Sequence, residues 1–173
     1  MENSNIEKYG LIGKNIDYSF SKQYFTEKFL REKLPNFSYQ NFDISDINKL
    51  QDVVDRTLYL KGLNVTIPYK ETVFPFLDKI NKKAFLIGAV NTIKITKKNK
   101  LKGYNTDYYG FKKSITPFLK PHHKKALILG TGGASKAVAY ALQLLAIDYK
   151  FVSRTPNPSE LRYEDLDENN FNE

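Results

Sequence analysis

The stretch Leu63–Glu71, Leu-Asn-Val-Thr-Ile-Pro-Tyr-Lys-Glu, holds the pattern from which the fold of this chain follows. Its first half alternates as a β-strand does, because successive side chains of a strand point to opposite faces. One face carries the apolar side chains Leu63, Val65 and Ile67, and the other carries Asn64 and Thr66. The apolar face predicts that one side of this strand is buried. The polar groups near its carboxyl end predict that this end of the sheet contacts a ligand.

Lys70 follows this strand at the position where the first turn of a helix should lie. A helix N-terminus carries partial positive charge, so a lysine there is held against the local field. Such a lysine is a candidate for proton transfer. The alternative is an ordinary surface lysine.

Outward from this strand, alternating and helical periodicities succeed each other along the chain, which indicates an α/β fold. We expect a mostly parallel sheet with one antiparallel hairpin in an N-terminal substrate domain, residues 1–120. An incomplete Rossmann-type βαβ unit, residues 121–173, should follow. The expected strands are 9–13, 38–44, 63–67, 90–96, 101–104, 125–129 and 148–153, and the expected helices are 21–33, 47–58, 69–77, 84–87, 108–119 and 134–145.

A glycine-rich turn, Gly130-Thr131-Gly132-Gly133-Ala134, lies between a predicted strand and a predicted helix. This is the context of a dinucleotide-binding loop, in which glycines let a pyrophosphate approach the backbone amides of the helix N-terminus. Ser135 departs from the usual third glycine. The alternative is a tight turn that binds nothing.

About 20 residues beyond such a loop, a site for NAD usually has a carboxylate that binds the ribose. This chain has Ser153-Arg154-Thr155 at that place. A guanidinium beside two hydroxyls suits a 2′-phosphate, so we expect NADP in preference to NAD. A surface arginine at a strand end is the alternative.

Further polar residues recur at predicted element ends, namely Ser19, Ser21, Asn91 and Asp107. A lysine beside an aspartate supplies the proton transfer that a hydride cofactor leaves to the protein, so we expect Lys70 and Asp107 to form an acid/base pair. Helix capping is the alternative explanation for Ser21 and for Asp107.

Composition excludes several classes of protein. There is no cysteine, and the adjacent His122 and His123 are better explained as a solvated linker than as a metal site. No apolar run is long enough for a membrane span, and the first residues resemble no signal peptide, so we expect a cytosolic protein. The net charge of +8 favours anionic ligands. Nucleic acid is a weaker alternative, because no basic stripe is present.

The chain resembles the shikimate dehydrogenase family. The run Asn-Val-Thr-Ile-Pro-Tyr-Lys-Glu, then Gly-Ala-Val-Asn-Thr, Asn-Thr-Asp, Gly-Thr-Gly-Gly-Ala-Ser and Ser-Arg-Thr occur in that family's order and spacing. Tyr18 and Lys22 depart from the family pattern next to the serines, and Lys14 departs from it after Gly13. The resemblance implies NADP-dependent, reversible reduction of 3-dehydroshikimate to shikimate.

By the same resemblance, Lys70 is the acid/base group and Asp107 its partner, and Ser19 and Ser21 bind the substrate carboxylate. The resemblance also implies that the ring hydroxyls are bound by Asn64, Thr66, Asn91 and Asp107. Gly130, Thr131, Gly132, Gly133 and Ala134 bind the pyrophosphate, and Ser153, Arg154 and Thr155 the adenosine phosphate. A quinate/shikimate dehydrogenase is a close alternative.

From Lys124 onward only 50 residues remain, fewer than a full dinucleotide domain needs. The resemblance therefore suggests a truncated protein with little turnover by itself, and a module that binds shikimate without catalysis is an open alternative. An incomplete parallel sheet exposes a strand edge, so we also expect a tendency toward homodimers.

Overall fold

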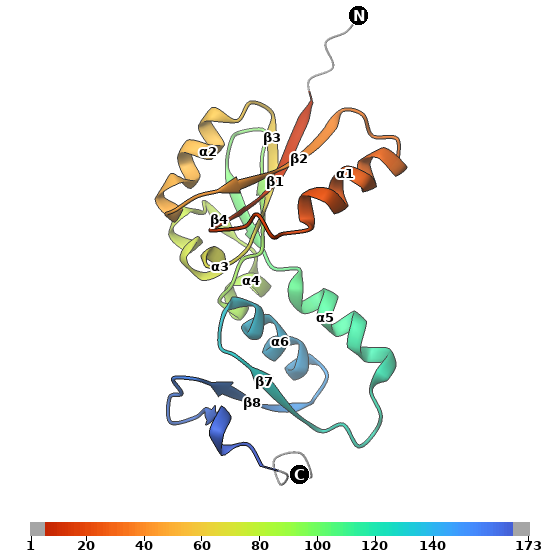
Figure 1. Ribbon diagram of the computed structural model, residues 1–173, viewed down its shortest axis with the longest axis vertical. Helices are drawn as coiled ribbons and strands as arrows, with labels where there is room; N and C mark the ends of the chain where they lie inside the picture. Colours follow the sequence, from red (N-terminus) through yellow and green to blue (C-terminus); the bar gives the residue numbers. More distant parts are fainter. Residues whose placement is uncertain (1–5, 168–173) are drawn as a thin grey trace, which may run out of the picture. The chain divides into compact units, whose positions relative to one another are not determined.

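The computed structural model describes residues 6–167 and divides them into two compact units (Figure 1). Unit 1 runs to Leu86 and includes Val90–Asn105, whereas unit 2 contains Ile87–Ala89 and the chain from Thr106 onward. Residues 1–5 and 168–173 lie outside the described residues. No helix in the described part is long and apolar enough to cross a membrane.

Unit 1 is built on a six-stranded sheet with the order β2-β1-β3-β5-β6-β4. Strands β2, β1 and β3 are parallel, β5 is antiparallel to both β3 and β6, and β4 is parallel to β6. The predicted α/β fold with a mostly parallel sheet and one hairpin is confirmed. The strands are β1 (Glu7–Gly13), β2 (Phe37–Asp43), β3 (Leu60–Val65), β4 (Lys79–Ile80), β5 (Thr92–Ile95) and β6 (Leu101–Tyr104).

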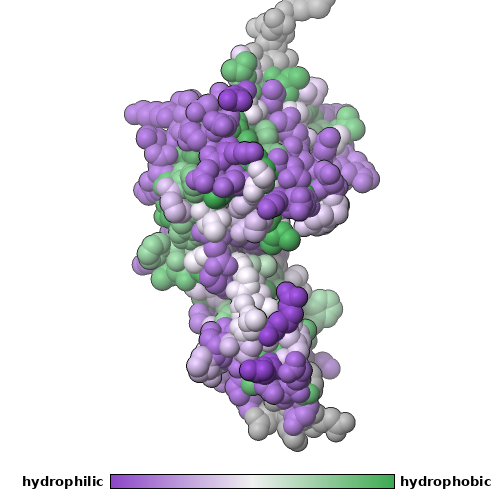
Figure 2. All heavy atoms as spheres, turned by 60° about the vertical axis from the view of Figure 1, so that its left-hand side comes forward, coloured by the Kyte–Doolittle hydropathy of each residue, from purple (hydrophilic) through white to green (hydrophobic). Residues whose placement is uncertain are grey.

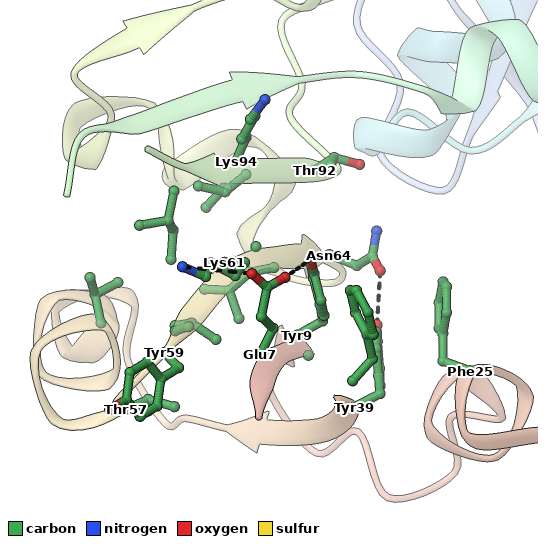
Figure 3. A pocket seen from close by; sticks show the side chains of 18 of the residues that line it. Glu7, Tyr9, Phe25, Tyr39, Thr57, Tyr59, Lys61, Asn64, Thr92 and Lys94 are labelled. Carbon is green, nitrogen blue, oxygen red and sulfur yellow. Dashed lines mark hydrogen bonds and ion pairs between the residues drawn. The ribbon is translucent and has the colours of Figure 1, made fainter. Parts of the chain in front are cut away.

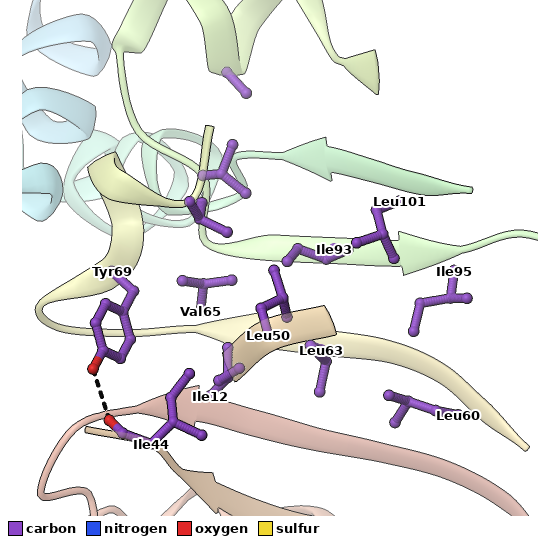
Figure 4. Close-up of a cluster of buried hydrophobic side chains, with 13 residues drawn as sticks. Ile12, Ile44, Leu50, Leu60, Leu63, Val65, Tyr69, Ile93, Ile95 and Leu101 are labelled. Atoms are coloured by element: carbon purple, nitrogen blue, oxygen red, sulfur yellow. Dashed lines mark hydrogen bonds between the residues drawn. The ribbon is translucent and has the colours of Figure 1, made fainter. Parts of the chain in front are cut away.

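Helices cover the two faces of this sheet unequally. On one face, α2, α3 and α4 enclose the main core, in which Leu50, Leu63 and Ile93 are almost fully buried (Figure 4). Each such side chain contributes about 1.5–3 kcal/mol to folding. On the other face, α1 packs over β1 and β2. The helical segments are α1 (Ser21–Arg31), η1 (Ile47–Lys49), α2 (Leu50–Arg56), α3 (Tyr69–Thr72), η2 (Phe74–Phe76) and α4 (Lys82–Ile87).

Three predicted elements of unit 1 differ from the structure more than at their ends. One is the helix expected at 47–58, which is η1 followed by α2. The strand expected at 63–67 ends at Val65, and Ile67, which we placed on the buried face, is 59% exposed. After Val65 the backbone turns, since Tyr69 N donates to Thr66 O. The single helix expected at 69–77 is divided into α3 and η2, because Pro75 lacks the N–H that would continue the α-helical ladder.

Unit 2 contains the strand–helix–strand unit predicted from the glycine turn. Its parallel sheet has the order β7-β8-β9, and α6 connects β7 to β8. The third strand, β9, was not predicted, since two residues are too few to show a period. The elements are α5 (Asp107–Ile115), η3 (Thr116–Phe118), β7 (Lys125–Leu129), α6 (Gly133–Leu144), β8 (Asp148–Ser153), β9 (Leu161–Arg162) and η4 (Tyr163–Asp165).

Helix α5 groups with unit 2 because it packs against α6, for example through Tyr108 and Tyr140, whose ring centroids are 5.3 Å apart. By contacts, the division therefore falls between Asn105 and Thr106, whereas the sequence suggested a boundary after residue 120. Which of the two divisions marks the functional domains stays a prediction.

Candidate functional site

Polar side chains from distant parts of the sequence gather at one edge of the unit 1 sheet. Strands β1 and β3 are parallel and end there, and the antiparallel β5 begins there. The backbone ties these ends together, since Val65 N donates to Asn91 O at 2.8 Å and Asn91 N donates to Tyr104 O at 3.0 Å. We call the following residues the sheet-edge site: Ser19, Ser21, Asn64, Thr66, Lys70 and Asn91.

The two serines follow β1 in a loop that an aspartate holds. Asp43, the last residue of β2, accepts hydrogen bonds from Asn15 N at 3.0 Å and from Ile16 N at 3.1 Å. Ile16 is fully buried, and its carbonyl accepts from Ser19 N. The loop is therefore anchored just before the serines.

The hydroxyls of Ser19 and Ser21 lie 3.1 Å apart, and both residues are partly exposed. Ser21 is the first residue of α1, whose cap position is occupied by Phe20 without a side-chain hydrogen bond. Capping therefore does not account for Ser21. A pair of hydroxyls at the N-terminus of an 11-residue helix can instead bind a carboxylate.

Lys70 is placed by the residue before it. Tyr69 is buried, and its hydroxyl donates to Ile44 O at 2.7 Å. Burial raises the pKa of Tyr69, so this hydroxyl stays a donor at neutral pH. The carbonyl of Lys70 accepts from Val90 N at 2.8 Å, next to Asn91. The side chain of Lys70 is only partly buried.

Helix α3 has only four residues. The partial charge at a helix end comes from several aligned peptide units, so a single turn exerts little field on Lys70. The argument from the helix dipole is therefore weaker than the sequence suggested, and the case for Lys70 depends on its neighbours at the sheet edge.

Asn91 is one of the few buried polar residues of unit 1, with 7% of its surface exposed. Its side-chain oxygen accepts from the hydroxyl of Thr92 at 3.0 Å. Asn105, which follows β6, is 6% exposed. We assigned no role to Asn105 from the sequence, although it stands in the quoted Asn-Thr-Asp motif.

A groove of about 950 Å³ opens on the sheet face that α1 leaves uncovered (Figure 3). Aromatic rings of Tyr9, Phe25 and Tyr39 line one part of it, and Lys94 lines another. The groove includes Asn64 of the sheet-edge site but neither Lys70 nor the serines. This groove is therefore adjacent to the sheet-edge site and includes only Asn64 of its residues.

The glycine turn of unit 2 has the geometry of a phosphate-binding loop. Gly130 has a φ of +105°, which favours glycine, and its N–H donates to Val152 O at 2.8 Å. A methyl group built on Gly132 would meet no atom within 4 Å. The space beside Gly132, the cap residue of α6, is thus open, and no acidic residue occupies the first turn of α6. These residues fit a pyrophosphate.

The end of β8 lies beside this turn, because β7 and β8 are paired in register up to Leu129 and Val152. Ser153 is 7% exposed, and its hydroxyl accepts from Thr155 N at 3.2 Å. Arg154 and Thr155 are exposed. Ser153 shapes the turn, and the two residues after it are available to a ligand.

Asp107 begins α5, and the side chain of Thr106 before it makes no capping hydrogen bond to the helix. Asp107 belongs to unit 2 and Lys70 to unit 1. Their predicted pairing therefore stays a prediction, as do the roles of all the site residues named from the sequence.

Fold and site together define a class of protein: an α/β unit with a polar sheet-edge site, followed by the first strands of a dinucleotide-type unit. Residues 11–93 match the family model described as the shikimate dehydrogenase substrate binding domain. A shikimate dehydrogenase (NADP(+)) of Clostridium botulinum is 42% identical over 163 residues, which cover 90% of this chain and 60% of that protein.

Solved structures show the same likeness. Shikimate dehydrogenase 1 from Peptoclostridium difficile has a TM-score of 0.81 and 38% identity, covering 92% of this chain and 61% of its own. The Thermus thermophilus enzyme in complex with NADP(H) and shikimate has a TM-score of 0.76 and 30% identity. That match covers 88% of this chain and 58% of the Thermus chain. The chain belongs to the shikimate dehydrogenase family, and it spans about 60% of the length of these relatives.

Proposed function

We propose that this chain binds shikimate and 3-dehydroshikimate at the sheet-edge site of unit 1 and NADP(H) at the glycine turn of unit 2. In this proposal the chain provides the substrate site and part of the cofactor site of a shikimate dehydrogenase, an enzyme that reversibly reduces 3-dehydroshikimate to shikimate. The observation that carries the proposal is that strand pairing and backbone hydrogen bonds bring the ends of β1, β3 and β5 together, and these ends carry or adjoin the residues of the sheet-edge site. Family membership supports the same assignment.

Each group has a task in this chemistry. The hydroxyls of Ser19 and Ser21 hold the ring carboxylate, and Asn64, Thr66 and Asn91 hydrogen-bond the ring oxygens. Lys70 donates a proton to the carbonyl oxygen during reduction and takes it back during oxidation, with Asp107 holding the ammonium. When bound, NADPH supplies the hydride.

The first test is a calorimetric titration of the chain with shikimate. We expect saturable binding, and binding of cyclohexene-1-carboxylate, which keeps the carboxylate and lacks the hydroxyls, at least about tenfold weaker. Equal affinity for the two ligands would contradict the hydroxyl-reading role. Stronger binding of quinate than of shikimate would favour the quinate alternative.

A second assay, NADPH formation from shikimate, separates the enzyme from a module that binds without turnover. The cytosolic location and the homodimer stay predictions. Light scattering after size-exclusion chromatography tests the dimer.

Arg154→Ala tests the choice of cofactor. If the guanidinium binds the 2′-phosphate, its removal should weaken NADP binding about 10- to 100-fold, which is the usual effect of losing charged hydrogen bonds. Binding of NAD, which has no 2′-phosphate, should be unchanged. The matched control is Lys150→Ala, which removes an exposed cation from β8, the strand that ends just before Arg154. An equal loss of NADP affinity in both variants would contradict the role of Arg154. Tighter binding of NAD than of NADP by the unmodified chain would contradict the choice of NADP as cofactor.

A further inference from the structure

Asn64 is held by a tyrosine two strands away in the sheet. Tyr39 is on β2 and Asn64 is on β3, with β1 between them. The hydroxyl of Tyr39 donates to Asn64 Oδ1 at 2.8 Å (Figure 3). In unit 1, this bond links the aromatic side of the groove directly to the sheet-edge site.

The donor in this bond is rigid. Tyr39 is 6% exposed, and the ring of Phe25 stacks on it with centroids 4.4 Å apart and an interplanar angle of 13°. Burial raises the pKa of Tyr39, so the hydroxyl keeps its proton throughout the physiological range. A buried tyrosine hydroxyl needs a hydrogen-bond partner, and Asn64 is that partner.

The bond decides which half of the Asn64 amide faces a ligand. An asparagine side chain offers a carbonyl acceptor at one end and two N–H donors at the other. With Oδ1 occupied by Tyr39, the nitrogen is turned away from the tyrosine, as Figure 3 shows. Asn64 itself is only partly buried and lines the groove.

We propose that Tyr39 is a positioning residue that fixes Asn64 as a hydrogen-bond donor to a ring oxygen of the substrate. This role rests on the proposed function, because it assumes that shikimate occupies the sheet-edge site. Without Tyr39, the amide can rotate and present its carbonyl, and ordering it again on binding reduces the affinity.

The neighbouring tyrosine supplies a matched control. Tyr9 of β1 is paired with Tyr39 in register, and its hydroxyl donates to Glu7 Oε2 at 3.1 Å. Tyr39→Phe and Tyr9→Phe therefore each remove one hydroxyl from adjacent aromatic rings on the same sheet face. Only Tyr39→Phe removes a bond to Asn64.

The affinity of the chain for shikimate is measured by calorimetry, with thermal unfolding checked for each variant. We expect Tyr39→Phe to weaken binding about three- to tenfold, as the loss of one hydrogen bond does. Tyr9→Phe should change it by less than about 1.5-fold. In an Asn64→Ala background, adding Tyr39→Phe should cause no further loss, because the tyrosine acts only through Asn64.

A second readout needs no ligand. The side-chain amide resonances of Asn64 in a ¹⁵N correlation spectrum should move in Tyr39→Phe and stay in place in Tyr9→Phe. If the original chain binds shikimate but the two tyrosine variants bind it equally, or the losses from Tyr39→Phe and Asn64→Ala add, the role of Tyr39 is wrong and the proposed function stands. If the original chain does not bind shikimate, the proposed function and this role both fall.

Discussion

Lys70→Ala should reduce the rate of shikimate oxidation about 1,000-fold while leaving shikimate affinity within about threefold, because a positioned acid/base group contributes 100- to 10,000-fold to such reactions. The hydrogen bond from Val90 N to the carbonyl of Lys70 involves backbone atoms only. Replacing the Lys70 side chain should therefore leave the sheet-edge site in place. The loss of activity should therefore appear in kcat, and the affinity for shikimate should change little.

The assay needs a complete cofactor domain. We would fuse this chain to the part of the Clostridium botulinum relative that it does not match, and follow NADPH absorbance. Lys79→Ala, which removes an exposed lysine of unit 1 on β4, is the control for a simple loss of charge. Its turnover should equal that of the unmodified fusion.

Lys70→Arg distinguishes proton transfer from electrostatic attraction. An arginine keeps the positive charge but does not release its proton at any working pH. We expect this variant to be nearly as slow as Lys70→Ala. Full activity of Lys70→Arg would mean that only the charge matters, and near-normal turnover of Lys70→Ala would remove the catalytic role altogether.

The sequence predicted those features of the fold that have a period. The alternation of Leu63, Asn64 and Val65 gave the strand and its polar face, and the strand–glycine–helix pattern gave β7 and α6. The same reasoning placed Ile67 in the strand, which was wrong, because a period does not reveal where a strand ends and a turn begins. The two-residue strands β4 and β9 were missed because they are too short for any pattern.

The candidate site was predictable as a set of residues and not as an arrangement. Motif order pointed to Lys70, Asn91 and the serines, but the residues that hold them carry no motif. Asp43 was missed although an aspartate that ends a strand is a recognisable signal for a bonded loop. Tyr39 lies in the strand predicted at 38–44, but its role was missed, since a hydrogen bond across an intervening strand leaves no local trace in the sequence.

The other large effect that we expect is on folding. Gly10 lies in β1, where Gln40 of β2 is its register partner. A methyl group at Gly10 would overlap the backbone carbonyl of Gln40 and would lie 2.5 Å from Phe42 Cε2. The carbonyl cannot move without separating two parallel strands. Gly10→Ala should therefore destabilise unit 1 by about 3 kcal/mol, at the upper end of overpacking effects.

A loss of about 3 kcal/mol lowers the melting temperature of a unit of this size by more than about 10 °C. Gly110→Ala is the matched control, because a methyl group at this position in α5 would meet nothing within 4 Å. Alanine favours a helix over glycine, so this variant should gain up to about 1 kcal/mol. Hydrogen exchange of amides in β1 and α5 reports on the two units separately. Unchanged protection of β1 in Gly10→Ala would mean that β1 and β2 are not as closely spaced as the register requires. Since β1 also precedes the serine loop and lies between Tyr39 and Asn64, the same variant should lose shikimate binding together with its stability.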